Sequence, residues 1–84
     1  VIVQCVQIPF KAFARFYGPG AHGIVTRTRS YSHEALEPKI KHYSRMNFNM
    51  AELEAMDVDP EGWPILTDPN GNLAEGIGHN LLNK

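Results

Sequence analysis

The sequence has one cysteine, no long apolar run and no excess of either charge. Cys5 has no second cysteine with which to form an internal disulfide. It stands in an apolar run, which predicts a buried structural thiol in a reducing compartment, and we therefore expect a cytoplasmic protein. The longest nearly apolar stretch, residues 1–8, is far shorter than the roughly 18 residues of a membrane-spanning helix, so no membrane partner is expected.

Charge and histidine spacing exclude two further classes of site. Eight Lys and Arg residues against nine Asp and Glu residues give a formal net charge of −1. Such a chain has no basic field to attract phosphates, so nucleic-acid binding is not expected. The four histidines share no helical spacing, and a single cysteine cannot complete a zinc ligand set, so no metal site is predicted.

The remaining composition is that of one small, ordered domain or part of one. Hydrophobic residues make up 43% of the 84 residues and charged residues 20%, which is ordinary globular usage. A chain of this length can bury only one small core. Because it begins at Val1 without an initiator methionine and ends as if entering a strand, we expect an internal fragment of a larger protein.

The first third of the chain predicts two strands and a linker. Alternating β-branched residues favour a strand over residues 1–8, which Pro9 ends. Residues 9–23 are aromatic first and then rich in glycine and proline, which indicates a packed linker. Alternation over residues 24–30 predicts a second strand with one solvated, cationic side.

A loop and one helix are predicted next. Residues 31–39 have no apolar periodicity and favour a loop. Ser44 is predicted to cap a helix that ends near Met56. The apolar positions of this helix recur at four and three residues, at Met46, Met50 and Leu53.

The last third predicts a β-hairpin followed by an irregular corner. Residues 63–67 favour a short strand, and residues 68–72 are typical of a tight turn. The hairpin is expected to return through residues 73–74. A glycine-containing corner over residues 75–80 then precedes a strand that restarts at residues 81–82.

Few residues have the spacing of a catalytic motif. The run Gly18–Gly23 fits the pattern G-x-G-x-x-G, but a strand rather than a helix is predicted after it, so a linker is favoured over a dinucleotide site. Lys41 and Glu75 remain as candidate catalytic residues. Spacing alone favours solvated surface charges for both residues. A role in Schiff-base chemistry would need a partly desolvated lysine and a carboxylate paired with a cationic ring nitrogen.

Several segments in order resemble the middle of a class IV (fold type IV) pyridoxal-phosphate-dependent aminotransferase. The resemblance rests on Lys41-His42-Tyr43, the following Ala/Met/Glu-rich helix, the run Pro64–Asp68 and, most specifically, the pattern D-x-x-G-x-x-x-E-G-x-G-x-N over Asp68–Asn80. It covers residues 1–84. The family includes branched-chain and D-amino-acid aminotransferases, (R)-selective amine transaminases and aminodeoxychorismate lyase.

This resemblance implies an α+β fragment of the two-domain D-amino-acid aminotransferase-like fold. Residues 1–9 would be the last strand of the small N-terminal domain, residues 10–23 the interdomain linker, and residues 24–84 the incomplete start of the large cofactor-binding domain. The full-length protein would be a homodimer.

The resemblance also assigns the site residues and the cofactor, pyridoxal 5'-phosphate. Lys41 would be catalytic, forming the Schiff base with the cofactor and moving the proton between substrate and cofactor carbons. Glu75 would pair with the pyridine nitrogen and keep it protonated. Gly76 and Gly78 would let the backbone approach the cofactor, and Asn80 would be a structural residue of the same corner.

Two features depart from the family pattern. Some branched-chain members have an aromatic residue five positions after the lysine, where this chain has Met46, and Tyr43 cannot simply take that role. The arginine and the backbone cup that hold the cofactor phosphate in the family would lie outside residues 1–84. The isolated fragment is therefore expected to be inactive.

The implied reaction is transfer of an amino group between an amino acid or amine and a 2-oxo acid, which would be the two small-molecule partners. An aminodeoxychorismate lyase-type enzyme of the same family would use the same Lys41 and Glu75. A non-catalytic relative that keeps the fold as a binding scaffold is the alternative from another class.

Overall fold

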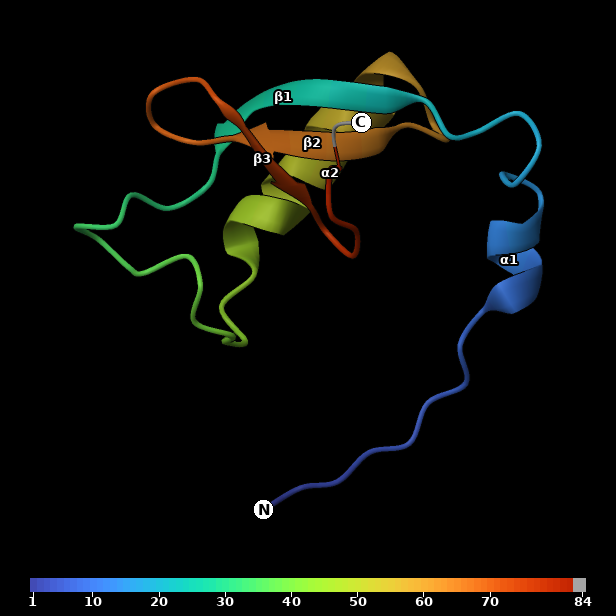
Figure 1. The fold of residues 1–84 in the computed structure, drawn as a ribbon, viewed down its shortest axis with the longest axis horizontal. Helices are drawn as coiled ribbons and strands as arrows, with labels where there is room; N and C mark the ends of the chain where they lie inside the picture. The colour runs from blue at the N-terminus through green and yellow to red at the C-terminus, as the bar shows by residue number, and fades with distance from the viewer. Residues whose placement is uncertain (83–84) are drawn as a thin grey trace.

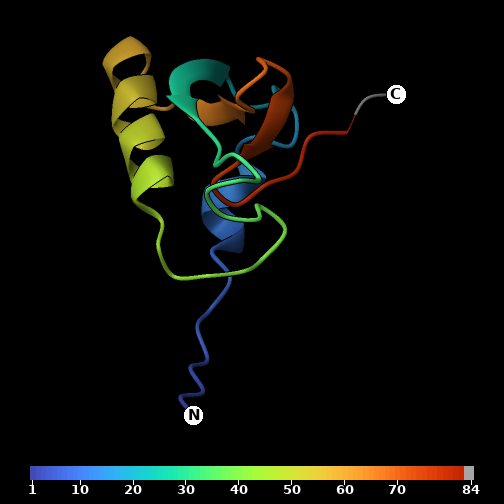
Figure 2. The ribbon, with the colours of Figure 1, turned by 90° about the vertical axis from the view of Figure 1, so that its left-hand side faces the viewer.

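The computed structural model describes residues 1–82 and shows a small α+β fold with a three-stranded sheet. Helix α2 lies against one face of the sheet, as Figures 1 and 2 show from two directions. The predicted α+β class is confirmed. No helix of the described part is both long enough and apolar enough to cross a membrane. The elements are α1 (Phe10–Ala14), β1 (Gly23–Arg29), α2 (Met46–Val58), β2 (Trp63–Thr67) and β3 (Leu73–Gly76).

The sheet has the order β1-β2-β3 and combines two kinds of pairing. β1 and β2 are parallel, joined by the crossover through α2, and β2 and β3 form an antiparallel hairpin. The predicted strand over residues 24–30 agrees with β1 to within one residue at each end, and that over residues 63–67 agrees with β2. Side chains along β1 alternate between exposed and less exposed, with Arg27 and Arg29 on the exposed side, as predicted.

The tight turn between β2 and β3 is also confirmed. The Asp68 carboxylate accepts hydrogen bonds from the backbone N–H groups of Asn70 and Asn72, both at 2.9 Å. Gly71 has a φ of 90°, a conformation that residues with a Cβ rarely adopt. Local side-chain chemistry therefore fixes the hairpin, as the Asp-Pro-Asn-Gly-Asn sequence predicts.

Helix α2 presents to the sheet a different face from the one predicted. Phe48, Ala51 and Ala55 are buried, while Met46, Met50 and Leu53 are 67%, 52% and 61% exposed. The two stripes have the same helical spacing, so periodicity could not distinguish them. Ala51 and Ala55 are fully buried, which lets the helix approach the strands closely, and Phe48 packs in one cluster with Leu66 of β2.

The start of α2 differs from the prediction too. Arg45, not Ser44, occupies the N-cap position, and it makes no side-chain capping hydrogen bond. Ser44 instead accepts a hydrogen bond at its carbonyl from the Tyr31 hydroxyl at 3.2 Å. The helix ends at Val58, two residues past the predicted Met56.

Residues 1–9 form an extended segment with no strand partner. Figure 1 shows this segment running away from the sheet, and all nine residues, including Cys5, are exposed. The predictions of a strand over residues 1–8 and of a buried thiol are therefore wrong here, because no described part of the chain offers the segment a ladder or a core. Leu81 and Leu82 form no strand either, and the rest of that predicted strand lies outside the described residues.

The aromatic part of the predicted linker contacts the end of the sheet, and residues 9–23 also contain helix α1, which the sequence did not predict. Phe13 and Phe16 meet the ring of Trp63 edge-on, with ring centroids 6.3 Å and 5.2 Å away. Arg15 forms an ion pair with Glu61 at 2.5 Å. The predicted packing therefore holds for the contacts with Trp63 and not for the linker as a whole, in which every residue except Phe16 is exposed. The division into residues 1–9, 10–23 and 24–84 stays a prediction.

Glu54 of α2 binds the middle of β1 at an irregularity in the sheet. The register between β1 and β2 shifts between Val25 and Arg29. There Oε1 of Glu54 accepts the Arg27 N–H at 2.5 Å, and Oε2 accepts both the N–H and the hydroxyl of Thr28 at 3.1 Å. These bonds, the one from the Arg27 N–H above all, lower the pKa of Glu54 below its usual 4.5. One carboxylate thus pairs two backbone amides that the ladder leaves free.

We predict that Glu54→Gln destabilises the chain by about 1–2 kcal/mol at neutral pH, because the amide's NH₂ group would face an N–H donor. The free energy of unfolding from urea titration measures this. Glu52→Gln, on an exposed position of the same helix, is the matched control and should change it by less than about 0.5 kcal/mol.

The stability difference between the parent chain and Glu54→Gln should depend on pH. A carboxyl whose pKa is lowered by folding stabilises the folded state above pH 4.5, and this contribution is lost as pH falls through the lower folded pKa. The difference between the parent chain and Glu54→Gln should therefore be large at neutral pH and shrink below pH 4.5. A difference that does not vary with pH would contradict the role of the charged carboxylate.

Candidate functional site

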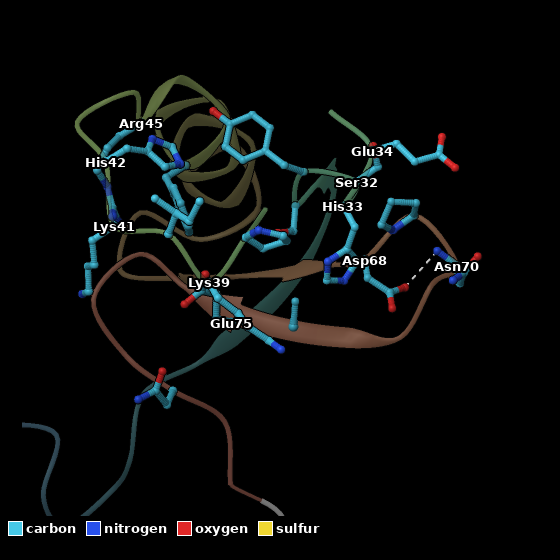
Figure 3. A pocket seen from close by; sticks show the side chains of 18 residues that line it. Ser32, His33, Glu34, Lys39, Lys41, His42, Arg45, Asp68, Asn70 and Glu75 are labelled. Carbon is cyan, nitrogen blue, oxygen red and sulfur yellow. Dashed lines mark hydrogen bonds between the residues drawn. The ribbon is translucent and has the colours of Figure 1, made fainter. Parts of the chain in front are cut away.

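A cavity of about 1010 Å³ lies where the loop after β1 faces the hairpin and the chain that follows β3. Figure 3 shows charged and polar side chains gathered around it from these separate segments. The lining residues that bear charge or can gain it are His33, Glu34, Lys39, Lys41, His42, Arg45, Asp68 and Glu75. The cavity is therefore lined by both cationic and anionic groups.

Lys41 and Glu75, the two residues singled out from the sequence, line this same cavity. Lys41 is exposed in the loop between β1 and α2, and Glu75 is half-buried in β3. Pairing of β3 with β2 and an isolated bridge to Asn80 hold the backbone of Glu75. Among residues 1–82, no ion pair joins Glu75 to a lysine, so both groups remain available to a ligand.

Lys39 brings a second amine to the cavity. It lines the cavity together with Lys41, whose side chain lies at the left of Figure 3. The backbone N–H of Lys39 donates to Glu37 at 3.2 Å. That carboxyl also contacts His33 at 3.0 Å, and this hydrogen bond is the main cause that lowers the pKa of Glu37. Lys39 is thus the natural comparison for any reactivity assigned to Lys41.

His42, next to Lys41, contributes a polar atom without a partner. Its Nδ1 is buried and has no hydrogen-bond partner among the described residues, and its ring lies 5.6 Å from the ring of Tyr31. A buried polar atom without a partner is costly, so this nitrogen is a candidate contact for a ligand in the cavity. Among residues 1–82 no three His, Cys, Asp or Glu side chains cluster in a way that could hold a metal ion.

The corner after β3 is tightly closed. The Gly76 N–H donates to the carbonyl of His79 at 3.1 Å, inside the bridge between Glu75 and Asn80. A Cβ on Gly76 would come within 1.9–2.5 Å of the imidazole of His79, whereas one on Gly78 would meet nothing within 4 Å. Gly76 therefore makes room for His79, and neither glycine is among the described residues that line the cavity.

Arg45 is the site residue that sequence reasoning missed. It lines the cavity, donates from Nη2 to the carbonyl of Ile77 at 2.5 Å, and places its guanidinium 4.1 Å from the ring centroid of Phe48. The sequence offered one sign that Arg45 is unusual: it stands just before a helix, where the helix dipole does not favour a cation.

Comparison with models of protein families found no matching family, and no match was found among the curated proteins or the solved structures. The resemblance to class IV aminotransferases, and with it the roles of Lys41 and Glu75, therefore stays a prediction.

We predict that Gly76→Ala destabilises the chain by about 1–3 kcal/mol, because the new methyl group must displace His79. Since His79 lies 5.2 Å from the ring of Trp63, the chain's only tryptophan, the change should also alter its fluorescence. Gly78→Ala is the matched control and should leave both the free energy of unfolding and the emission nearly unchanged. Equal effects of the two substitutions would show that the packing of His79 does not explain the glycine.

Proposed function

We propose that this chain is part of a pyridoxal-phosphate-dependent class IV aminotransferase that transfers an amino group between an amino acid or amine and a 2-oxo acid. The observation that carries the proposal is that Lys41 and Glu75, far apart in the sequence, line one cavity. These are the two residue types that the chemistry needs, one amine to bind an aldehyde and one carboxylate to hold a ring proton.

The residues present fit such a cofactor in kind, an amine and a carboxylate that line one cavity. Lys41 is exposed here, so in this proposal the desolvation that its chemistry needs would come from parts of the enzyme beyond this chain. The cavity of about 1010 Å³ is at the upper end of the range of small-molecule sites, roughly 300–1,000 Å³. The buried Nδ1 of His42, which has no hydrogen-bond partner among residues 1–82, gives the cavity a polar contact still to be made. Lys41 and Glu75 would hold the two ends of the ring system, while the phosphate would be held by residues beyond this chain.

In this proposal the cofactor, when bound, supplies an aldehyde for the amino group and a ring that withdraws electrons from the reacting carbon. Lys41 would hold the cofactor's aldehyde through Nζ, and the same amine would accept and return the proton at the reacting carbon. Glu75 would place its carboxylate beside the ring nitrogen, where a charge-assisted hydrogen bond would favour the protonated ring. Placement of Glu75 in a paired strand limits how far its backbone can move.

The exposed N-terminal segment fits the same proposal. Val1, Ile2, Val3, Val6 and Ile8 are apolar and exposed. Such a segment needs strand neighbours, and in the proposed two-domain enzyme these would come from the rest of the small domain. The proposed enzyme is a homodimer, and we place it in the cytoplasm.

Covalent trapping tests the role of Lys41 in the full-length protein. Borohydride reduction after loading with pyridoxal phosphate should fix the cofactor on the peptide containing Lys41, and peptide mass spectrometry locates it. Lys41→Ala should abolish amine transfer, because the amine that binds the aldehyde is lost.

Lys39→Ala is the matched control, since Lys39 lines the same cavity. It should retain the trapped cofactor and most of the activity. Label on Lys39 would contradict the assignment of Lys41. Release of pyruvate without transfer to a 2-oxo acid would replace the aminotransferase by the family's lyase activity.

Replacement of Glu75 tests the second role. Glu75→Gln keeps the shape but removes the charge that holds the ring proton, so kcat should fall by about tenfold or more while cofactor binding largely survives. Steady-state kinetics and cofactor titration measure the two effects separately. Glu34→Gln, a carboxylate of the same cavity, is the control. An unchanged kcat in Glu75→Gln would refute the assignment.

A further inference from the structure

Arg45 connects two segments of the cavity that are far apart in the sequence. It follows Lys41 by four positions and directly precedes α2, while its hydrogen-bond acceptor Ile77 follows Glu75 by two positions. The guanidinium is held on a second side by the ring of Phe48, at 4.1 Å from the centroid. The side chain therefore has little freedom to leave the corner.

The acceptor is itself part of a rigid unit. The side chain of Ile77 packs against the core cluster that contains Phe48. The bond from the Gly76 N–H to His79 and the bridge from Glu75 to Asn80 close the corner on either side of Ile77. A displacement of the Ile77 carbonyl would consequently move the backbone of Glu75 as well.

We propose that Arg45 is a positioning residue, which holds Glu75 at a fixed place relative to the Lys41 segment by tying the corner to the start of α2. The effect of Arg45 on catalysis rests on the proposed function, whereas the tie, which is the hydrogen bond from Arg45 to Ile77, does not. A charged donor makes a stronger hydrogen bond to a carbonyl than a neutral one. The flat guanidinium can bond the carbonyl and stack on the ring together, which a lysine ammonium cannot do equally well.

Hydrogen exchange tests the tie without any cofactor. In Arg45→Met, which keeps the length and apolar packing but has no donor, the amide of Gly76 should exchange about tenfold faster or more, because the corner opens more readily. The amides of β1 serve as the internal reference. Unchanged exchange at Gly76 would overturn the proposal, whether or not the protein binds pyridoxal phosphate.

Arg15→Met is the matched control variant. Arg15 also stacks on a phenylalanine, Phe16, with its guanidinium carbon 4.5 Å from the centroid, and it also has a second contact, to Glu61. It lines a different cavity, beside Trp63. Arg15→Met should therefore lower stability without raising exchange at Gly76.

The catalytic part is tested in the full-length protein loaded with pyridoxal phosphate. Misplacement of Glu75 should lower kcat about tenfold in Arg45→Met with less than a threefold change in KM, and should reduce the visible circular dichroism of the cofactor. Arg45→Lys should lie between Arg45→Met and the parent, and it also replaces Arg45→Met if that variant does not fold. Arg15→Met should keep the parent kcat and dichroism.

The outcomes separate this inference from the proposed function. No cofactor on Lys41 of the parent protein would refute the proposed function, and hydrogen exchange would still decide on the tie. Faster exchange with unchanged kcat and dichroism would mean that Arg45 only stabilises the fold, which overturns the positioning role. Parent behaviour in Arg45→Lys would show that a charged donor alone suffices, which overturns the part of the proposal that requires the guanidinium stacked on Phe48.

Discussion

Parallel pairing of β1 with β2 is the constraint on which the rest of this structure depends. Because the two strands run in the same direction, their carboxyl ends lie side by side at the same end of the sheet. Two bonds continue the pairing past the strand ends: the Ser30 N–H donates to the carbonyl of Thr67, and the Arg29 side chain donates to the carbonyl of Asp68, both at 2.8 Å. The loop that carries Lys41 and the hairpin that carries Glu75 thus start from neighbouring points.

Two charged side chains join the sheet, helix α2 and the segments that line the cavity. Glu54 binds the irregular part of β1 to α2, and Arg45 binds the start of α2 to the corner after β3. Each supplies the hydrogen-bond partner that backbone groups of a bulged strand or an irregular corner lack. The positions of the cavity walls therefore follow from a few specific polar contacts as much as from the small apolar core around Leu66.

The sequence predicted well the features that local chemistry determines. β1, β2 and the hairpin follow from side-chain alternation and from the Asp68 turn, whose glycine adopts a φ that other residues avoid. It failed where the choice depends on distant contacts. The two apolar stripes of α2 have equal spacing, and only the tight packing of Ala51 against the sheet decides between them. Residues 1–8 have strand composition but no partner within the described chain.

The site shows the same division. Spacing alone favoured surface charges for Lys41 and Glu75, and only the family resemblance singled them out. The structure brings both to one cavity. For Arg45 the only local sign was a cation just before a helix, and this sign does not predict the contacts with Phe48 and Ile77. Long-range contacts of this kind lie beyond the reach of sequence periodicity.

The central claim is that Lys41 and Glu75 hold opposite ends of one cofactor. A crystal structure of the full-length protein loaded with pyridoxal phosphate tests it most directly. We expect electron density continuous from Nζ of Lys41 to the cofactor, and the ring nitrogen within hydrogen-bond distance of the Glu75 carboxylate. A cofactor joined to a different lysine, or a ring nitrogen without contact to Glu75, would contradict the account.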